Sequence, residues 1–270
     1  EDIIDRITLS KNDHKILANY CKKKKILFSS TPLDLEAVDF LDSLNVPFFK
    51  VASMDLNNHV LLEKIATKNK PIILSTGFST ISEISQALKH LRDSNSKIKV
   101  ALLHCISSYP PQDKDLNLNN ISLLREKFKV PVGFSDHTVG ISASICAAAL
   151  GACVIEKHFT LDKKMKGWDH KISANPNELT EIIKNSNRIN IMLGVKERKI
   201  SKKENEFKKN MRRSIVAKRY IKKNELIKFS DLDFKRPGTG LAPSKVKLIL
   251  NKFAKKNIYP DEIISLSQIK

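Results

Sequence analysis

Short apolar runs rich in β-branched residues alternate with amphipathic helical patterns along the first part of this chain. Short, continuous apolar runs are typical of parallel strands that are covered on both faces. Helices are predicted between the runs, for example over residues 80–91, where Thr80 and Glu83 have the spacing of a capping box. The six runs lie at residues 25–30, 47–53, 71–76, 99–105, 130–136 and 152–159. The pattern predicts a parallel α/β domain.

Polar residues gather where each run ends, and they favour a TIM-type barrel over an open sheet. In a (β/α)8 barrel the carboxyl ends of all strands meet at one mouth, whereas an open sheet uses only the ends near its switch point. Periodicity alone fits both folds, so the polar ends decide for the barrel. They carry Ser29-Ser30-Thr31, Lys50 and Ser53, Ser75-Thr76, His104 through Ser107, Ser135-Asp136-His137 and Glu156-Lys157-His158.

The chain changes character after a predicted helix that stops at Gly194. A polar stretch follows and is interpreted as a linker over residues 196–210. The remaining residues, 211–270, contain short strand patterns, turns and the Gly/Pro-rich loop "KRPGTG". We therefore expect a barrel domain over residues 1–195, the linker, and a small β-rich domain over residues 211–270.

Composition argues against several classes of protein but does not identify the function. The formal charge of +19 comes from lysines spread along the chain with acidic residues between them, and no recognition helix or aromatic platform accompanies them. This distribution argues against a nucleic-acid partner and favours a solvated surface. No run reaches the roughly 20 apolar residues of a membrane span, and the four cysteines lack C-x-x-C spacing. We expect a cytoplasmic protein without a membrane partner or a disulfide framework.

Two histidines suggest a metal site at the predicted mouth. His137 and His158 end neighbouring runs, so their imidazoles are expected to face the same opening and to suit a divalent ion with open positions. Such an ion can polarise a carbonyl. Glu156 lies two residues before His158 and projects to the same side of its strand, where it can position or deprotonate a substrate hydroxyl. The Ser, Thr and Lys residues of the other run ends suit a small anion, although some of the hydroxyls also cap helices.

Eight motifs occur in an order that closely resembles the sialic acid synthase family, which includes N-acetylneuraminate, legionaminate and pseudaminate synthases. They are "FSSTP", "KVAS", "ILSTG", "HCISSYP", "GFSDHTVG", "EKHFTLD", "GWDH" and "KRPGTG". The resemblance implies a TIM barrel followed by an antifreeze-like (SAF) domain in a domain-swapped homodimer. It implies condensation of phosphoenolpyruvate with an N-acylated hexosamine-type aldose, such as N-acetylmannosamine, to a nine-carbon 2-keto-3-deoxy acid and phosphate.

The resemblance also implies roles for individual residues. His137 and His158 hold a divalent metal, which is Mn²⁺, with Mg²⁺ and Co²⁺ as alternatives, and Glu156 and Asp55 act in catalysis. Tyr109, Glu156 and Arg236 contact the sugar, and Arg236 reaches the site from the partner subunit. The residues implied to bind phosphoenolpyruvate are Thr31, Lys50, Ser53, Ser107 and Ser135.

Family members begin with two further βα units, so the resemblance predicts a barrel that lacks its first two units in the chain as printed. A chain truncated in this way is expected to need those units for activity. An alternative function is therefore a non-catalytic remnant, or a split subunit that pairs with another chain. A nucleic-acid binder resting on charge alone is a further alternative, which salt-sensitive binding would reveal.

Overall fold

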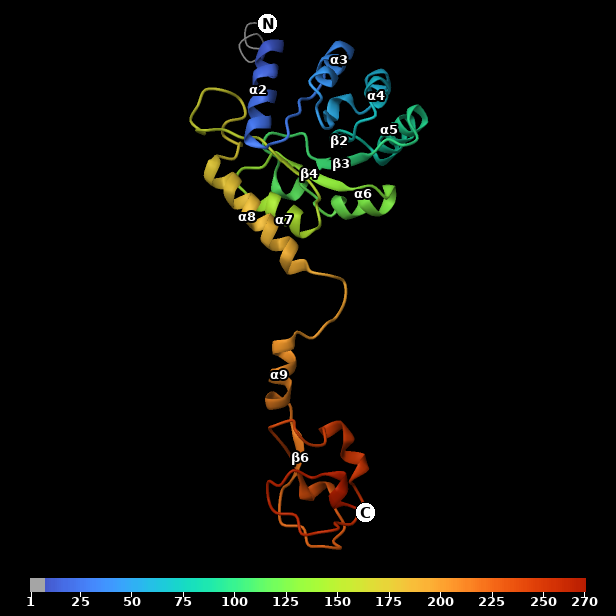
Figure 1. Cartoon of the computed structure of the whole chain (residues 1–270), viewed down its shortest axis with the longest axis vertical. Coiled ribbons are helices and arrows are strands. Elements are labelled where there is room, and N and C mark those ends of the chain that lie inside the picture. The colour runs from blue at the N-terminus through green and yellow to red at the C-terminus, as the bar shows by residue number, and fades with distance from the viewer. Residues whose placement is uncertain (1–7) are drawn as a thin grey trace. The chain divides into compact units, whose positions relative to one another are not determined.

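The computed structural model describes residues 8–270, which form two compact units (Figure 1). The first unit ends at Gly194, and the second runs from Val195 to Lys270. Across residues 8–270, no helix is both long enough and apolar enough to cross a membrane.

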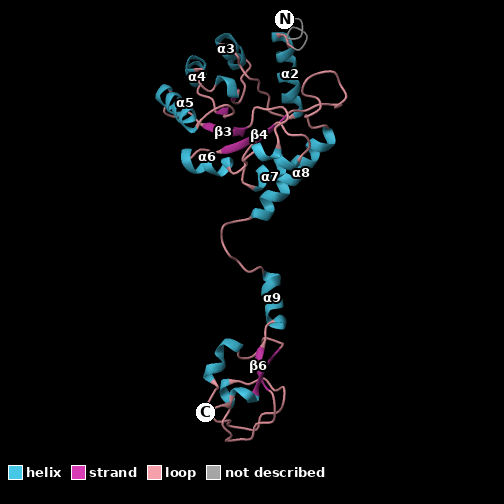
Figure 2. Ribbon diagram, turned by 180° about the vertical axis from the view of Figure 1, so that it is seen from behind, coloured by secondary structure: helices cyan, strands magenta, loops and turns pink. Residues whose placement is uncertain are grey.

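The first unit is built on a parallel sheet of five strands in the order β1-β2-β3-β4-β5. The sheet curls into a half-barrel with helices around its outside (Figure 2). This architecture confirms the predicted α/β barrel-type fold. The strands are β1 (Phe49–Val51), β2 (Ile72–Ser75), β3 (Val100–Cys105), β4 (Val132–Asp136) and β5 (Ile155–Lys157).

Two helix ends of this unit lie where the sequence pattern predicts them. The capping box between Thr80 and Glu83 is present at the start of α5, and Gly194, with φ of +55°, follows directly after α8. The described helices of the unit are α2 (Lys11–Lys24), α3 (Leu35–Ser43), α4 (His59–Ala66), α5 (Ile81–Ser94), α6 (Asn120–Phe128), α7 (Ser142–Ala149) and α8 (Pro176–Leu193).

One predicted strand, residues 25–30, does not join the sheet. Ile26 and Leu27 are 64% and 73% exposed. A side-chain hydrogen bond joins this segment to the residue before β1: Ser29 Oγ donates to the Phe48 carbonyl at 2.8 Å. The segment has the composition of a strand, but a segment becomes a strand only where a neighbouring strand forms hydrogen bonds with its backbone.

The sheet has one face toward the helices and one toward the inside of the half-barrel. Val51, Leu74, Leu102 and Phe134 are buried against the helical layer in one core. Because side chains alternate along each strand, their neighbours in sequence point inward. The parallel register therefore decides which polar residues meet on the inner face.

The second unit has its own apolar core, centred on residues such as Ile215 and Ile258. Strands β6 (Ser214–Ala217) and β7 (Leu232–Lys235) pair antiparallel, and isolated bridges join other short extended segments. Part of the expected linker is helical, because Ser201 caps α9 (Lys202–Met211), which has no buried residues. Short 3-10 helices lie at Ser53–Asp55, Asp113–Asp115, Phe229–Asp231, Pro243–Leu248 and Leu266–Gln268.

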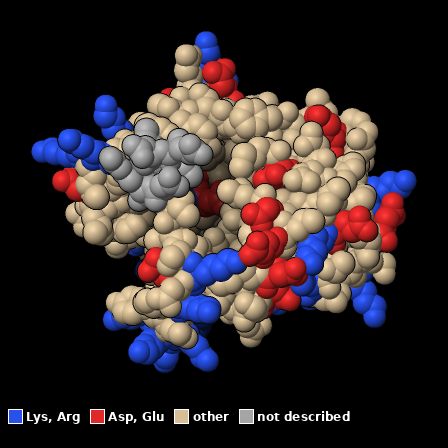
Figure 3. Space-filling model, turned by 90° about the horizontal axis from the view of Figure 1, so that it is seen from above, with Lys and Arg blue, Asp and Glu red and all other residues tan. Residues whose placement is uncertain are grey.

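The surface charge follows the sequence expectation of mixed signs. On the face shown in Figure 3, Lys and Arg side chains stand beside Asp and Glu side chains. Ion pairs such as Lys64 with Asp39, at 2.8 Å, account for part of this mixture. Interspersed charges of both signs are typical of a solvated surface.

Candidate functional site

The parallel register brings polar residues from neighbouring strands together on the inner face. Cys105 of β3 lies opposite Ser135 of β4, and Ser135 lies opposite Glu156 of β5. Lys50 of β1 and Ser75 of β2 lie on the same face near the carboxyl ends of their strands. The face that the sequence predicted as a mouth is thus lined from all five strands.

Glu156 is the centre of a hydrogen-bonded group on this face. Ser135 Oγ donates to Glu156 Oε1 at 2.7 Å, and Lys50 Nζ lies 3.4 Å from Glu156 Oε2. The side chain of Lys50 is 14% exposed and that of Glu156 is 40% exposed. The Lys50 ammonium is thus largely shielded from water and lies beside a carboxylate and a hydroxyl. In this position it is suited to a charge-assisted hydrogen bond with an anionic ligand.

His137 follows directly after β4 and is buried. Its Nδ1 lies 2.9 Å from the Ile106 carbonyl oxygen, so in the neutral ring the proton is on Nδ1 and Nε2 is the unprotonated nitrogen. Burial lowers the pKa of His137. The Cys105 thiol, the Ile106 carbonyl and the Glu156 charge together raise it by more, so the pKa lies above its ordinary value. The ring is therefore held in one orientation by the backbone of the next strand end.

His158 lies one residue beyond β5, and its ring centroid is 5.4 Å from that of His137. Its Nδ1 lies 3.6 Å from Asp169 Oδ2. Burial lowers the pKa of His158 below its ordinary value, against the raising effect of Asp169, which favours the neutral imidazole. Tyr109 stands over both rings, at centroid distances of 4.2 Å from His137 and 5.9 Å from His158.

The two histidines fit a shared divalent ion. Metal–nitrogen bonds of about 2.1 Å place the centroids of two imidazoles around one ion about 4.5–5.5 Å apart, which includes the observed separation. In each ring Nδ1 faces an oxygen, so Nε2 is the nitrogen left to bind. Within residues 8–270, no group of three or more His, Cys, Asp or Glu side chains is arranged to hold a metal. A divalent ion held by this pair would take its other ligands from water or substrate.

A second cluster of hydroxyls lies around Gly77, after β2. The Gly77 amide donates to Ser53 Oγ at 3.0 Å. A methyl group on Gly77 would lie 2.2 Å from Ser107 Oγ and 2.8 Å from Ser53 Oγ. Two of the predicted anion-binding serines are thus neighbours, brought together because residue 77 has no side chain.

Two buried side-chain oxygens near this cluster lack a hydrogen-bond partner among the described residues. They are Ser75 Oγ, at the end of β2, and Asp55 Oδ2, just after β1. The other carboxylate oxygen, Asp55 Oδ1, accepts from Asn58 Nδ2 at 3.3 Å. Buried polar atoms are generally satisfied, so unpartnered ones at strand ends are consistent with a ligand position.

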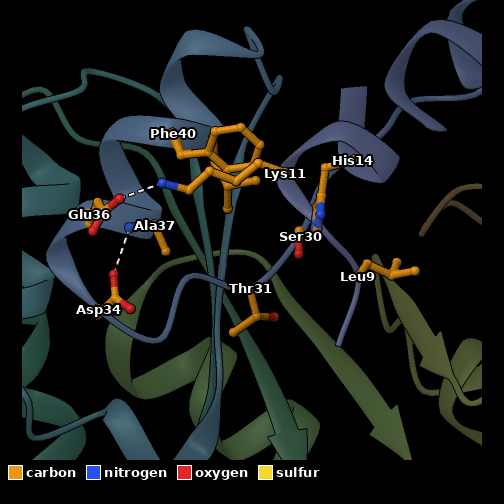
Figure 4. Close-up of a pocket in the computed structure, with 10 residues that line it drawn as sticks. Leu9, Lys11, His14, Ser30, Thr31, Asp34, Glu36, Ala37 and Phe40 are labelled. Atoms are coloured by element: carbon orange, nitrogen blue, oxygen red, sulfur yellow. Dashed lines mark hydrogen bonds and ion pairs between the residues drawn. The ribbon is translucent and has the colours of Figure 1, made fainter. Parts of the chain in front are cut away.

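Thr31 lies in a pocket of about 240 Å³ between α2 and α3 (Figure 4). Ser30, His14 and Leu9 share the pocket with it. An ion pair from Lys11 in α2 to Glu36 in α3 spans the same pocket. A place for Thr31 in the anion site remains a prediction.

Arg236 belongs to the second unit and is exposed, directly after β7. Its loop is anchored by Ser214, whose Oγ donates to the Pro237 carbonyl at 2.6 Å and accepts from the Gly240 amide at 2.8 Å. A fixed loop can present one long side chain to a distant ligand. The contact of Arg236 with a sugar remains a prediction.

The structure corrects the expectation for His104 and adds two residues to which the sequence analysis gave no role. His104 faces the helical layer, where its Nε2 lies 2.7 Å from the Leu116 carbonyl, and burial lowers its pKa. Cys105 faces the site instead, with its Sγ 4.0 Å from His137 Nδ1, and a parity count along β3 would have found it. Asp169, in the motif "GWDH", was given no role although it lies beside His158.

Comparison with known proteins places these residues in a family context. The NeuB family model matches residues 1–198, and the SAF domain model matches residues 212–270. An uncharacterized protein of Methanocaldococcus jannaschii is 47% identical over 263 residues, which are 97% of this chain and 78% of that protein. The N,N'-diacetyllegionaminic acid synthase of Campylobacter jejuni is 43% identical and covers 97% of this chain and 79% of its own length.

A solved structure shows the same likeness. The N-acetylneuraminic acid synthetase of Leptospira borgpetersenii, crystallised with citrate, superposes with a TM-score of 0.70 at 38% sequence identity. The match covers 74% of this chain and 69% of that one. The sequence and structural likenesses therefore agree on one family.

Proposed function

The chain belongs to the NeuB family and ends in a SAF domain, and from that premise we propose that it is a phosphoenolpyruvate-dependent sugar acid synthase. Its acceptor is an N-acylated hexosamine-type aldose such as N-acetylmannosamine. One phosphoenolpyruvate, one aldose and one water balance against the nine-carbon 2-keto-3-deoxy acid and one phosphate. The bond that forms joins C3 of phosphoenolpyruvate to the aldehyde carbon, and the phosphate leaves as the C2 ketone appears.

The observation that carries the proposal is the group of Lys50, Ser135 and Glu156 beside the two histidines. Lys50 and the hydroxyl of Ser135 suit the carboxylate and phosphate of phosphoenolpyruvate, because both are held on the inner face by Glu156. Ser53 and Ser107 add two neighbouring hydroxyls around Gly77. We assign these four residues, with Thr31, to phosphoenolpyruvate.

The sugar is assigned to the open side of the same group. The Glu156 carboxylate is partly exposed, so it can accept a hydrogen bond from a sugar hydroxyl or remove its proton. Tyr109, which stands over both imidazoles, lies where an aldehyde approaching them would pass. Asp55 is assigned a catalytic role because its buried Oδ2 has no hydrogen-bond partner among the described residues and is free to contact a ligand.

His137 and His158 are assigned as the residues that hold a divalent metal, with Mn²⁺ as the proposed ion and Mg²⁺ or Co²⁺ as alternatives. When bound, such an ion supplies Lewis-acid polarisation of the sugar aldehyde. The chain's own contribution is to keep both rings oriented through Ile106 and Asp169.

The domain arrangement is part of the proposal. We assign residues 1–195 to the synthase domain, 196–210 to the linker and 211–270 to the SAF domain. In a domain-swapped homodimer, Arg236 of one protomer contacts the sugar in the site of its partner. The anchored loop around Ser214 supports this role, because it holds the arginine at the surface.

Turnover with a panel of sugars tests the proposal. The chain, extended at its N-terminus with the first two βα units of a NeuB-family relative, is incubated with phosphoenolpyruvate, MnCl₂ and either N-acetylmannosamine or a bacillosamine-derived sugar, and phosphate release is measured. We expect release that needs both sugar and metal, stops with EDTA and is lost in Glu156→Gln. The matched control Glu63→Gln, on the exposed side of α4, keeps the rate. If the extended chain binds phosphoenolpyruvate but releases no phosphate with any of these sugars, the proposed activity is refuted.

A further inference from the structure

A buried ion pair lies behind the two histidines, on the helix-facing side of the same strand ends. Asp136 of β4 and Lys157 of β5 are opposite each other in the register, and Lys157 Nζ lies 3.1 Å from Asp136 Oδ2. Their side chains are 0% and 3% exposed. Each is the direct chain neighbour of a histidine, because His137 follows Asp136 and His158 follows Lys157. The pair thus couples the two backbone segments that carry the imidazoles.

The hydrogen bonds of this pair converge on the residue that follows His137. Asp136 Oδ1 accepts from both the backbone amide and the hydroxyl of Thr138, each at 2.8 Å. Lys157 Nζ donates to the Thr138 carbonyl at 2.5 Å. Ser144 Oγ, in α7, donates to Asp136 Oδ2 at 2.5 Å. His137 therefore lies between Asp136 and Thr138 in the chain, and Lys157 of β5 contacts both of these residues.

A buried ion pair is a weak source of stability, because removing two charges from water offsets most of their attraction. Replacing such a pair with neutral groups of similar volume is often harmless to stability, whereas removing one partner is strongly destabilising. What the bonds of Asp136 and Lys157 do fix is geometry, since they join two strands and a helix at one point.

We propose that Asp136 and Lys157 are positioning residues that set the separation and orientation of His137 and His158. The inference rests on the proposed metal site. Side chains alternate along a strand, so the inward-facing Glu156 and His158 flank the outward-facing Lys157. A shift of the β4 end against the β5 end moves one imidazole relative to the other, and the ion pair opposes that shift.

The test compares metal affinity with stability. In Asp136→Asn/Lys157→Met both charges are removed together. Isothermal titration of metal-free protein with MnCl₂ is expected to show an affinity about 10- to 100-fold weaker than wild type, as for other residues that orient metal ligands. The unfolding midpoint is expected to stay within about 3 °C of wild type. Lys157→Met alone, which leaves a buried charge unpaired, is expected to lower that midpoint by about 10 °C.

An ion pair at the opposite end of the strands, partly exposed rather than buried, serves as the control. Lys70, just before β2, lies 2.7 Å from Asp42 near the end of α3. Asp42→Asn/Lys70→Met is expected to leave the affinity for Mn²⁺ unchanged. Should the double variant at the site fail to fold, Ser144→Ala removes one hydrogen bond to Asp136 and is expected to weaken Mn²⁺ binding about three- to tenfold.

The outcomes separate this inference from the proposed function. If the folded double variant, or Ser144→Ala in its place, binds Mn²⁺ as tightly as wild type while His137→Ala loses affinity, the positioning role is wrong and the metal site stands. If His137→Ala and His158→Ala both bind as tightly as wild type, the metal site itself is wrong and the inference fails with it.

Discussion

Gly77 offers a sharp test of how the anion site is packed. A methyl group at this position would lie 2.2 Å from Ser107 Oγ and 2.8 Å from Ser53 Oγ, well inside van der Waals contact. The φ of Gly77 lies outside the left-handed region, so an alanine backbone is acceptable there and the steric contact is the main perturbation. Gly77→Ala therefore asks whether the two serine hydroxyls can move.

The cost has two parts. Turning both hydroxyls away breaks the bond from the Gly77 amide to Ser53 Oγ, which contributes about 1 kcal/mol. Overpacking a closed site adds about 1 kcal/mol at the low end of its range, because a serine hydroxyl rotates more easily than backbone moves. We expect Gly77→Ala to lower the free energy of unfolding of the first unit by about 2 kcal/mol. If Ser53 and Ser107 bind phosphoenolpyruvate, its affinity falls as well.

Urea unfolding followed by circular dichroism measures the first effect, and calorimetric titration with phosphoenolpyruvate measures the second. Ser107→Ala removes the closest atom, so Gly77→Ala/Ser107→Ala should recover part of the lost stability relative to the sum of the single changes. A Gly77→Ala protein within about 0.5 kcal/mol of wild type, together with strictly additive effects in the double variant, would refute the packing argument.

Three further predictions follow from the same structure. His137→Ala and His158→Ala should each abolish Mn²⁺ binding in calorimetry while the circular dichroism spectrum is kept; retained binding in both would place the ion elsewhere. Arg236→Ala should raise the KM for the sugar without weakening phosphoenolpyruvate binding, and mixing it with His137→Ala should restore turnover through hybrid dimers; a monomer in sedimentation, with no recovery, contradicts this. Thr80→Ala should destabilise the first unit by about 1 kcal/mol in urea unfolding because it removes the α5 cap, whereas Ser82→Ala on the exposed side of the same turn should not.

Much of the fold and of the site was accessible from the sequence, for reasons that are local. The cap at Thr80 and the stop at Gly194 depend on a few neighbouring residues, so they can be predicted without tertiary information. Five of the six apolar runs are strands because each pairs with at least one other strand of the sheet. Polar residues after these runs identified His137 and His158, since parallel strands place their carboxyl ends at one edge.

The sequence by itself determined the order of strands and helices and the edge of the sheet where polar residues gather, because periodicity and capping are properties of short segments. Only the tertiary structure decided which of those residues face each other. It turned His104 toward the helices and Cys105 toward His137, left residues 25–30 outside the sheet, and set Asp136 opposite Lys157 behind the histidines. The physical reason is the register, since backbone pairing between distant segments fixes the face on which each side chain lies.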